Sequence, residues 1–120
     1  MNTMQMTAFQ FGVQNTKEGV TVTFGDNAER DNHYVSIEWD LQEHCSRIEI
    51  DDQIFSANDA ISEIKLSNRE LVLHIMSDKV QFTKNIQVII LMPEKDKDWP
   101  REVVTAIEWL SARINAKSKQ

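Results

Sequence analysis

The sequence predicts an α+β fold, with a mostly antiparallel meandering β-sheet that is packed on one face by a C-terminal α-helix. Apolar and polar residues alternate from about residue 6 to residue 92, and apolar residues recur at helical spacing from about residue 99 to residue 115. Only short turns separate the predicted strands, which permits antiparallel pairing and excludes parallel crossovers. With 120 residues, the chain is expected to form a single domain over 1–120, with a frayed tail at 116–120.

The third predicted strand shows the alternation most clearly. Val35, Ile37 and Trp39 face one way, while Glu38 and Asp40 face the other. Residues 88–91 are apolar on both faces, so the last strand is expected in the centre of the sheet. Residues 80–82 fit either a short strand or an ordered loop. In chain order, the predicted strands cover residues 9–13, 20–24, 35–41, 47–50, 53–55, 64–66, 71–75 and 86–92.

The predicted helix follows Pro93, which ends the strands, and has Pro100 in its first turn, where proline costs least. An apolar stripe along it is expected to pack on the sheet, with Trp99 at its N-terminal end and Ala106 beside it. The stripe consists of Val103, Ile107, Leu110 and Ile114. Trp39 and Trp99 are expected in the core because they lie on apolar stripes. Trp109, at the flank of the helix stripe, is expected to be the most exposed tryptophan.

The negative charge of the chain is concentrated in one segment. Between Glu38 and Glu63 there are eight carboxylates and one base, Arg47, whereas the other residues include 11 acids and 12 bases. This segment therefore carries −7 against a formal net charge of −6 for the whole chain. Such a localised field attracts a basic partner and speeds its encounter. We expect one continuous partner-binding surface made of Glu38, Asp40, Glu43, Glu49, Asp51, Asp52, Asp59 and Glu63.

Composition excludes several other classes of function. A pI near 5.0 and the lack of clustered Lys and Arg argue against binding of nucleic acid or of an anionic membrane surface. No secretory signal or membrane-spanning run is visible, and the single Cys45 excludes an internal disulfide. We therefore expect a cytoplasmic protein.

Catalytic and metal-binding motifs are sparse. Asp40, Glu43, His44 and Cys45 lie close in sequence, but their spacing favours a polar turn over a tetrahedral metal site. His74 lies between apolar neighbours on a strand and is expected to be a packed histidine. No metal, cofactor or catalytic residue is predicted, and we expect the protein not to be an enzyme.

A short motif at residues 47–53 (RIEIDDQ) precedes two further strands at 61–67 and 71–75. With the apolar strand and closing helix behind it, this order resembles immunity proteins of bacterial polymorphic toxin systems, including contact-dependent growth inhibition. The resemblance covers roughly residues 34–114. It implies a small cytoplasmic antitoxin, without enzymatic activity, that binds and neutralises one cognate toxin domain, often a basic nuclease. The carboxylates would then take the place of the nucleic-acid phosphates that the toxin grips.

Two alternatives remain open at this stage. One is a peptide-binding chaperone or adaptor module that uses a free sheet edge for strand addition. The other is a small metal-dependent hydrolase built on Glu49, Asp51 and Asp52, since alternation points Glu49 and Asp51 to the same side. For the 51–52 pair, a role in shaping a turn competes with a role in binding.

Overall fold

The computed structural model describes residues 2–26 and 33–119 and has the predicted α+β fold. Its elements in chain order are β1 (Thr3–Ala8), β2 (Gln10–Thr16), β3 (Gly19–Gly25), β4 (Tyr34–Asp40), β5 (Cys45–Ile50), β6 (Asp52–Asn58), β7 (Ile61–Leu66), β8 (Leu71–Ile75), the 3-10 helix η1 (Val80–Phe82), β9 (Val88–Pro93) and α1 (Arg101–Ser118). No helix in the described ranges has both the length and the apolar character needed to cross a membrane.

The strands form two sheets. Sheet B has the order β2-β3-β4-β5-β6 and is the predicted antiparallel meander, whereas sheet A has the order β1-β9-β8-β7. In sheet A the strands β7, β8 and β9 pair antiparallel, and β1 pairs parallel with β9. The sequence does not predict the division into two sheets. The physical reason for two sheets is that β3, β4 and β5 each bury a full apolar face, and one helix cannot cover so large an area.

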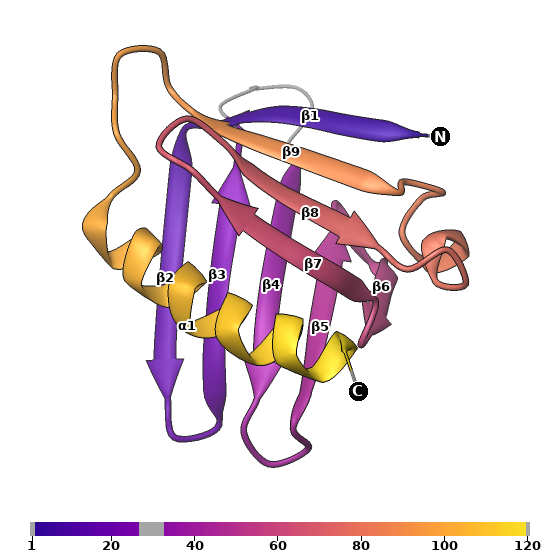
Figure 1. Ribbon diagram of the computed structural model, residues 1–120. Coiled ribbons are helices and arrows are strands. Elements are labelled where there is room, and N and C mark those ends of the chain that lie inside the picture. The colour runs from indigo at the N-terminus through magenta and orange to yellow at the C-terminus, as the bar shows by residue number, and fades with distance from the viewer. Residues whose placement is uncertain (1, 27–32, 120) are drawn as a thin grey trace.

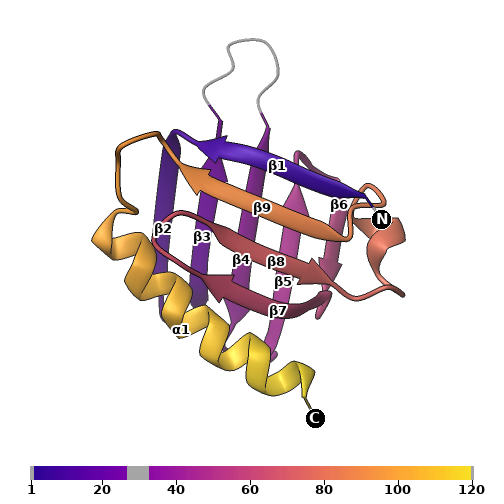
Figure 2. The ribbon, with the colours of Figure 1, turned by 45° about the horizontal axis from the view of Figure 1, so that its top comes forward.

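The two sheets and the helix make two layers. The strands of sheet A run across sheet B, and α1 lies beside β7, where it extends the layer of sheet A over sheet B (Figures 1 and 2). The core fills the space between the layers and includes Phe24, Ile37, Ile48, Leu73 and Leu91, all fully buried. The opposite face of sheet B therefore remains outside the core.

The core confirms most predictions about apolar residues. The four residues of the helix stripe and the neighbouring Ala106 are all buried. Trp39 and Trp99 are buried, while Trp109 is only partly buried. The indole nitrogen of Trp99 donates a hydrogen bond to the Ser67 carbonyl at 3.0 Å, which gives this buried ring the polar partner it needs.

Two elements, β1 and η1, differ from the sequence-based expectation. The strand β1 lies outside the predicted strands, although Met4 and Met6 alternate with polar residues there. Because β1 pairs with β9, β9 lies between β1 and β8 in the interior of its sheet, as predicted. Residues 80–82 form the helix η1 and not a strand.

The helix α1 also continues beyond the predicted end at residue 115. Lys117 Nζ bonds the His44 carbonyl at 2.6 Å, and Ser118 Oγ donates to the Ser62 carbonyl at 2.7 Å. These contacts tie the last turn to both sheets, so residues 116–118 are ordered helix and not the expected frayed tail.

Candidate functional site

The outer face of sheet B carries part of the predicted acidic surface. The burial pattern of β4 places Val35, Ile37 and Trp39 inward, which leaves Glu38 and Asp40 on the outer face. Sheet A and α1 lie on the other side of sheet B (Figures 1 and 2). Glu38 and Asp40 point outward because successive side chains of a strand point to opposite faces of the sheet. These two carboxylates therefore face solvent.

A polar hollow of about 270 Å³ lies on this outer face, beside the β2–β3 turn. Three carboxylates line it, from Glu18, Glu38 and Asp40, together with neutral side chains such as Gln14 and Thr21. Among residues 2–26 and 33–119, no ion pair is formed by any of these three acids. The hollow therefore has the charge and polarity to receive a cationic side chain from another molecule.

Two residues, Asp40 and Arg47, set the shape and the charge of this face. Asp40 Oδ1 accepts hydrogen bonds from the backbone of Gln42 at 2.8 Å and Glu43 at 3.0 Å, so it also holds the β4–β5 turn. Arg47 lies opposite Glu38 in the β4–β5 ladder and is the only Lys or Arg in strands β2 to β6. Arg47, together with Lys17 in the β2–β3 turn, offsets part of the charge, and the face stays acidic.

Glu49 lies on the same outer face but is already bonded within the chain. The Tyr34 hydroxyl donates to Glu49 Oε2 at 2.6 Å, and Arg47 Nη2 lies 3.7 Å from Glu49 Oε1. The hydrogen bond to Glu49, with a smaller contribution from burial, raises the pKa of Tyr34 to about 12. Tyr34 and Arg47 thus occupy part of the hydrogen-bonding capacity of Glu49, which leaves less of it for an outside partner.

Asp51 connects distant segments of the chain through its hydrogen bonds. It follows β5 at a bulge with φ 64°, a left-handed conformation that Asp tolerates better than most residues. Its carboxylate accepts hydrogen bonds from Lys84 Nζ at 2.8 Å, from the Tyr34 amide at 3.0 Å and, at 3.1 Å, from His33 Nδ1. Burial raises the pKa of Asp51, but these bonds outweigh it and hold the pKa below its usual range.

The other predicted acids are dispersed. Asp59, at φ 50°, accepts from the Ser46 amide at 3.1 Å and pairs with Lys117 Nζ at 2.9 Å. Asp52 accepts from the Ile54 amide at 3.2 Å and shapes the start of β6. Glu63 lies on β7 in sheet A and pairs with Lys65 at 3.2 Å.

The expected single surface of eight acids is therefore divided by the fold. Glu38, Asp40, Glu43 and Glu49 belong to the outer face of sheet B and its β4–β5 turn. Asp51 and Asp59 are bound by lysines of distant segments, Asp52 is a turn residue, and Glu63 lies on the other sheet. The physical reason is that the chain passes from sheet B to sheet A between β6 and β7, which carries Glu63 away.

Sequence reasoning missed Glu18. In an antiparallel meander every second turn lies at the same end of the sheet, so the β2–β3 and β4–β5 turns are neighbours. That rule, applied to the predicted strands, would have placed Glu18 near Asp40, although Glu18 lies outside the acidic segment of the sequence.

The geometry offers little support for a metal-dependent hydrolase. In the part of the chain that the structure describes, no group of three or more His, Cys, Asp and Glu is arranged to hold a metal ion. Glu49, Asp51 and Asp52 each accept hydrogen bonds within the chain, and Tyr34 bonds both Glu49 and Asp51. Burial, the largest cause, raises the pKa of Cys45, which keeps its thiol in the less reactive protonated form.

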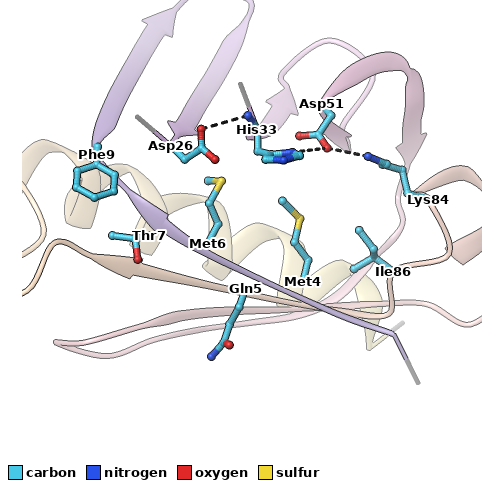
Figure 3. Close-up of a pocket in the computed structure, with 10 residues that line it drawn as sticks. All are labelled: Met4, Gln5, Met6, Thr7, Phe9, Asp26, His33, Asp51, Lys84 and Ile86. Carbon is cyan, nitrogen blue, oxygen red and sulfur yellow. Dashed lines mark hydrogen bonds and ion pairs between the residues drawn. The ribbon is translucent and has the colours of Figure 1, made fainter. Parts of the chain in front are cut away.

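A second concave site lies at the opposite end of sheet B. It is a groove of about 660 Å³, bordered by Met4, Met6 and Phe9 on one side and by His33 and Lys84 on the other. Figure 3 shows Met4 and Met6 pointing from β1 toward the His33, Asp51 and Lys84 cluster, and Gln5 pointing away from it. The sequence does not predict this groove, because its two sides come from segments far apart in the chain.

Comparisons with protein families, with curated proteins and with solved structures gave no match for this chain. The geometry of the acidic face and of the groove is therefore the basis for assigning a function.

Proposed function

We propose that this chain is a cytoplasmic immunity protein, without catalytic activity or cofactor, that binds and neutralises a basic toxin domain through the outer face of sheet B. The observation that most directly supports this proposal is the hollow lined by Glu18, Glu38 and Asp40. The carboxylates of these residues form no ion pair with the described Lys and Arg residues. The motif at residues 47–53, which resembles that of immunity proteins, lies at the margin of the same sheet.

Physical considerations favour a protein partner with a basic surface. A polar, acidic sheet face with an open hollow offers charged contacts over an area, whereas a small ligand needs an enclosing pocket. Carboxylates on this face would pair with the Lys and Arg residues with which a nuclease grips phosphates. Such complementarity raises the association rate from about 10⁵–10⁶ to as much as 10⁸–10⁹ M⁻¹s⁻¹ at low salt. Fast capture is what protection against a lethal enzyme requires.

The proposed contact set is narrower than the acidic segment of the sequence. Glu18, Glu38, Asp40 and Glu43 would contact the toxin first, because they are exposed or line the hollow. Glu49 would contribute at the margin. Asp51 and Asp59 would support the fold and not the interface, since lysines of this chain already hold them.

The test uses the full chain and the basic C-terminal domain of the secreted protein that we expect to be encoded next to it. The triple variant Glu18→Gln, Glu38→Gln and Asp40→Asn is compared with a matched triple in and beside sheet A: Glu63→Gln on β7, Glu70→Gln in the β7–β8 turn and Glu94→Gln after β9. Both remove three negative charges. We expect the first to lower the association rate in stopped flow by at least about tenfold, and to lose toxin protection in a growth assay, while the second changes little. Equal losses in both variants, or no binding of that domain by the unaltered chain, would overturn the proposal.

A further inference from the structure

The two edges of sheet A are built differently. At the β7 edge, Asn115 of α1 bonds the Ile64 backbone like a neighbouring strand, with its oxygen accepting from the amide at 2.9 Å and its nitrogen donating to the carbonyl at 3.2 Å. Ser118 satisfies the Ser62 carbonyl in the same row. The β1 edge has no such cover among the described residues.

The free backbone groups of β1 can be identified from the ladder. The Asn2 carbonyl accepts from the Gln87 amide at 2.9 Å and the Val88 amide at 3.3 Å, so the even-numbered residues of β1 direct their backbone groups to β9. Thr3, Gln5 and Thr7 therefore direct theirs away from it. Within the described chain, none of these three residues makes a backbone hydrogen bond to another segment on that side.

This edge also lacks the features by which proteins protect a sheet edge. Natural edge strands carry charges, prolines or bulges that block pairing with another chain. The segment Thr3–Ala8 has no charged residue and no proline, and its pairing with β9 is regular over six residues. An unprotected edge of this kind is a template for an added strand.

The space beside the edge is a groove with apolar side chains. Met4 and Met6 of β1 and Ile86 before β9 line it, with Phe9 at one end, in a volume of about 660 Å³. Methionine side chains are flexible and polarisable and adapt to different apolar partners. Because side chains alternate along an added strand, every second residue of that strand would face these methionines.

The far side of the groove presents hydrogen-bond donors. The carboxylate oxygens of Asp51 accept hydrogen bonds from Lys84, His33 and the Tyr34 amide. Lys84 Nζ has three N–H donors and gives one to Asp51, so it is the group on this side that can donate further hydrogen bonds. Both side chains are partly open to solvent, at 35% for Lys84 and 47% for His33. Asp26 and Asp51 also line the groove, so the complementary group is a single carboxylate placed at Lys84 and away from these two acids.

We propose that this groove binds an extended peptide segment, which adds to β1 as a fifth strand of sheet A and places a carboxylate beside Lys84. The backbone of the peptide pairs with Thr3, Gln5 and Thr7, and its alternate apolar side chains pack over Met4 and Met6. The site does not depend on the proposed toxin interface, because the acidic hollow lies at the other end of sheet B, beside the β2–β3 turn.

The probe is a fluorescein-labelled peptide of six residues that alternates threonine and valine and ends in a free carboxylate, with anisotropy as the readout on the full chain. Two further arms separate the sources of the carboxylate: the same peptide with an amidated end, and an amidated peptide whose last residue is glutamate. We expect saturable binding of the free acid, slowed amide hydrogen exchange at Thr3, Gln5 and Thr7, and at least about tenfold weaker binding of the amidated peptide without glutamate.

Variants test the backbone pairing. Gln5→Pro removes a donor that points away from β9, at an edge position where proline is tolerated, and should abolish peptide binding. Gln5→Ala, the matched control, keeps the backbone donor and should bind normally. If Gln5→Pro fails to fold, a peptide methylated on the amides that face β1 replaces it and should not bind the unaltered chain. Lys84→Gln should weaken the free acid at least about tenfold and leave the amidated peptide unchanged.

Several results would overturn this proposal. They are the absence of saturable binding by all three peptides, equal binding by Gln5→Pro and Gln5→Ala, and full affinity of the methylated peptide. Binding of dodecanoate to the groove without any peptide binding would instead identify a site for small amphiphiles. A dimer that Gln5→Pro dissociates, with no peptide binding to the monomer, would assign the edge to a second copy of this chain.

Discussion

The carboxylates at the strand ends and those on the outer face of sheet B have the same chemistry but opposite roles. Asp51 and Asp59 each accept a backbone amide and a lysine from a distant segment. Glu18 and Glu38 have no such lysine among the described residues and face a hollow. The difference shows that the local density of charge in the sequence does not tell which role each carboxylate has. Asp51 and Asp59 stabilise the fold, whereas Glu18 and Glu38 are free to contact a partner.

The largest effect on stability is expected at Asp51. Asp51→Ala leaves the Tyr34 amide, Lys84 and His33 without their shared acceptor and puts alanine at φ 64°. We expect the free energy of unfolding in urea to fall by about 2–4 kcal/mol. Asp51→Asn, which keeps an acceptor and tolerates this backbone, should cost less. The neighbouring control Asp52→Ala should cost at most about 0.5 kcal/mol. An equal loss in both alanine variants would contradict the internal role of Asp51.

A smaller effect is expected at Asp59. Its bond to the amide of the buried Ser46 should make Asp59→Ala cost about 1–2 kcal/mol in urea unfolding. The ion pair with Lys117 is about 40% exposed on both sides, so its coupling in a double-mutant cycle should be only about 0.2–1 kcal/mol. A coupling well above this range would show that the pair acts as a buried one.

The lowered pKa of Asp51 predicts a loss of stability in acid. The unfolded chain binds the Asp51 proton more readily than the folded one, so protonation favours unfolding. The contribution is complete above the unfolded pKa of about 3.9 and is lost as the pH falls through the lower folded pKa. Melting temperatures from pH 6 to pH 2.5 should therefore fall less steeply in Asp51→Asn than in the unaltered chain. Parallel curves would contradict this.

The smallest effects on stability are expected at the outer face. The triple variant Glu18→Gln, Glu38→Gln and Asp40→Asn should change the free energy of unfolding by no more than about 0.5 kcal/mol, because surface substitutions away from packed groups do little. The asparagine keeps the oxygen that holds the β4–β5 turn. A loss near that of Asp51→Ala would show that the two groups of acids do not differ.

Divalent metals provide a further comparison of the same groups. Addition of Mg²⁺, Mn²⁺ or Zn²⁺ should leave the melting temperature unchanged, because no described cluster of acids is arranged for a metal. A rise that Asp51→Asn removes would revive the metal-dependent hydrolase that the sequence left open.

Local patterns predicted those features of the fold that depend on neighbouring residues. The alternation in residues 35–40 placed Glu38 and Asp40 outward, and the helical spacing identified the buried stripe of α1. Both follow from side-chain geometry within one element. The position of Glu18 beside Asp40 also follows from the meander, once the turns are assigned to the ends of the sheet.

The rest depends on contacts between distant segments. Lys84 and Asp51 are 33 residues apart, and Lys117 and Asp59 are 58 apart, so the sequence does not show which acids are neutralised. The division into two sheets depends on which strands pair after the chain leaves β6, and β1 joins β9 from the other end of the chain. The groove exists only because of that pairing.

The hydrogen bond between Tyr34 and Glu49 turns the only tyrosine of the chain into an optical probe. A tyrosine in an unfolded chain ionises near pH 10, whereas the pKa of Tyr34 in the folded protein is about 12. Between these values, phenolate absorbance near 295 nm would report the opening of sheet B at Tyr34. Alkali itself favours that opening, since the unfolded chain releases the phenol proton first. A label-free spectrophotometric titration could thus follow the loosening of the acidic face.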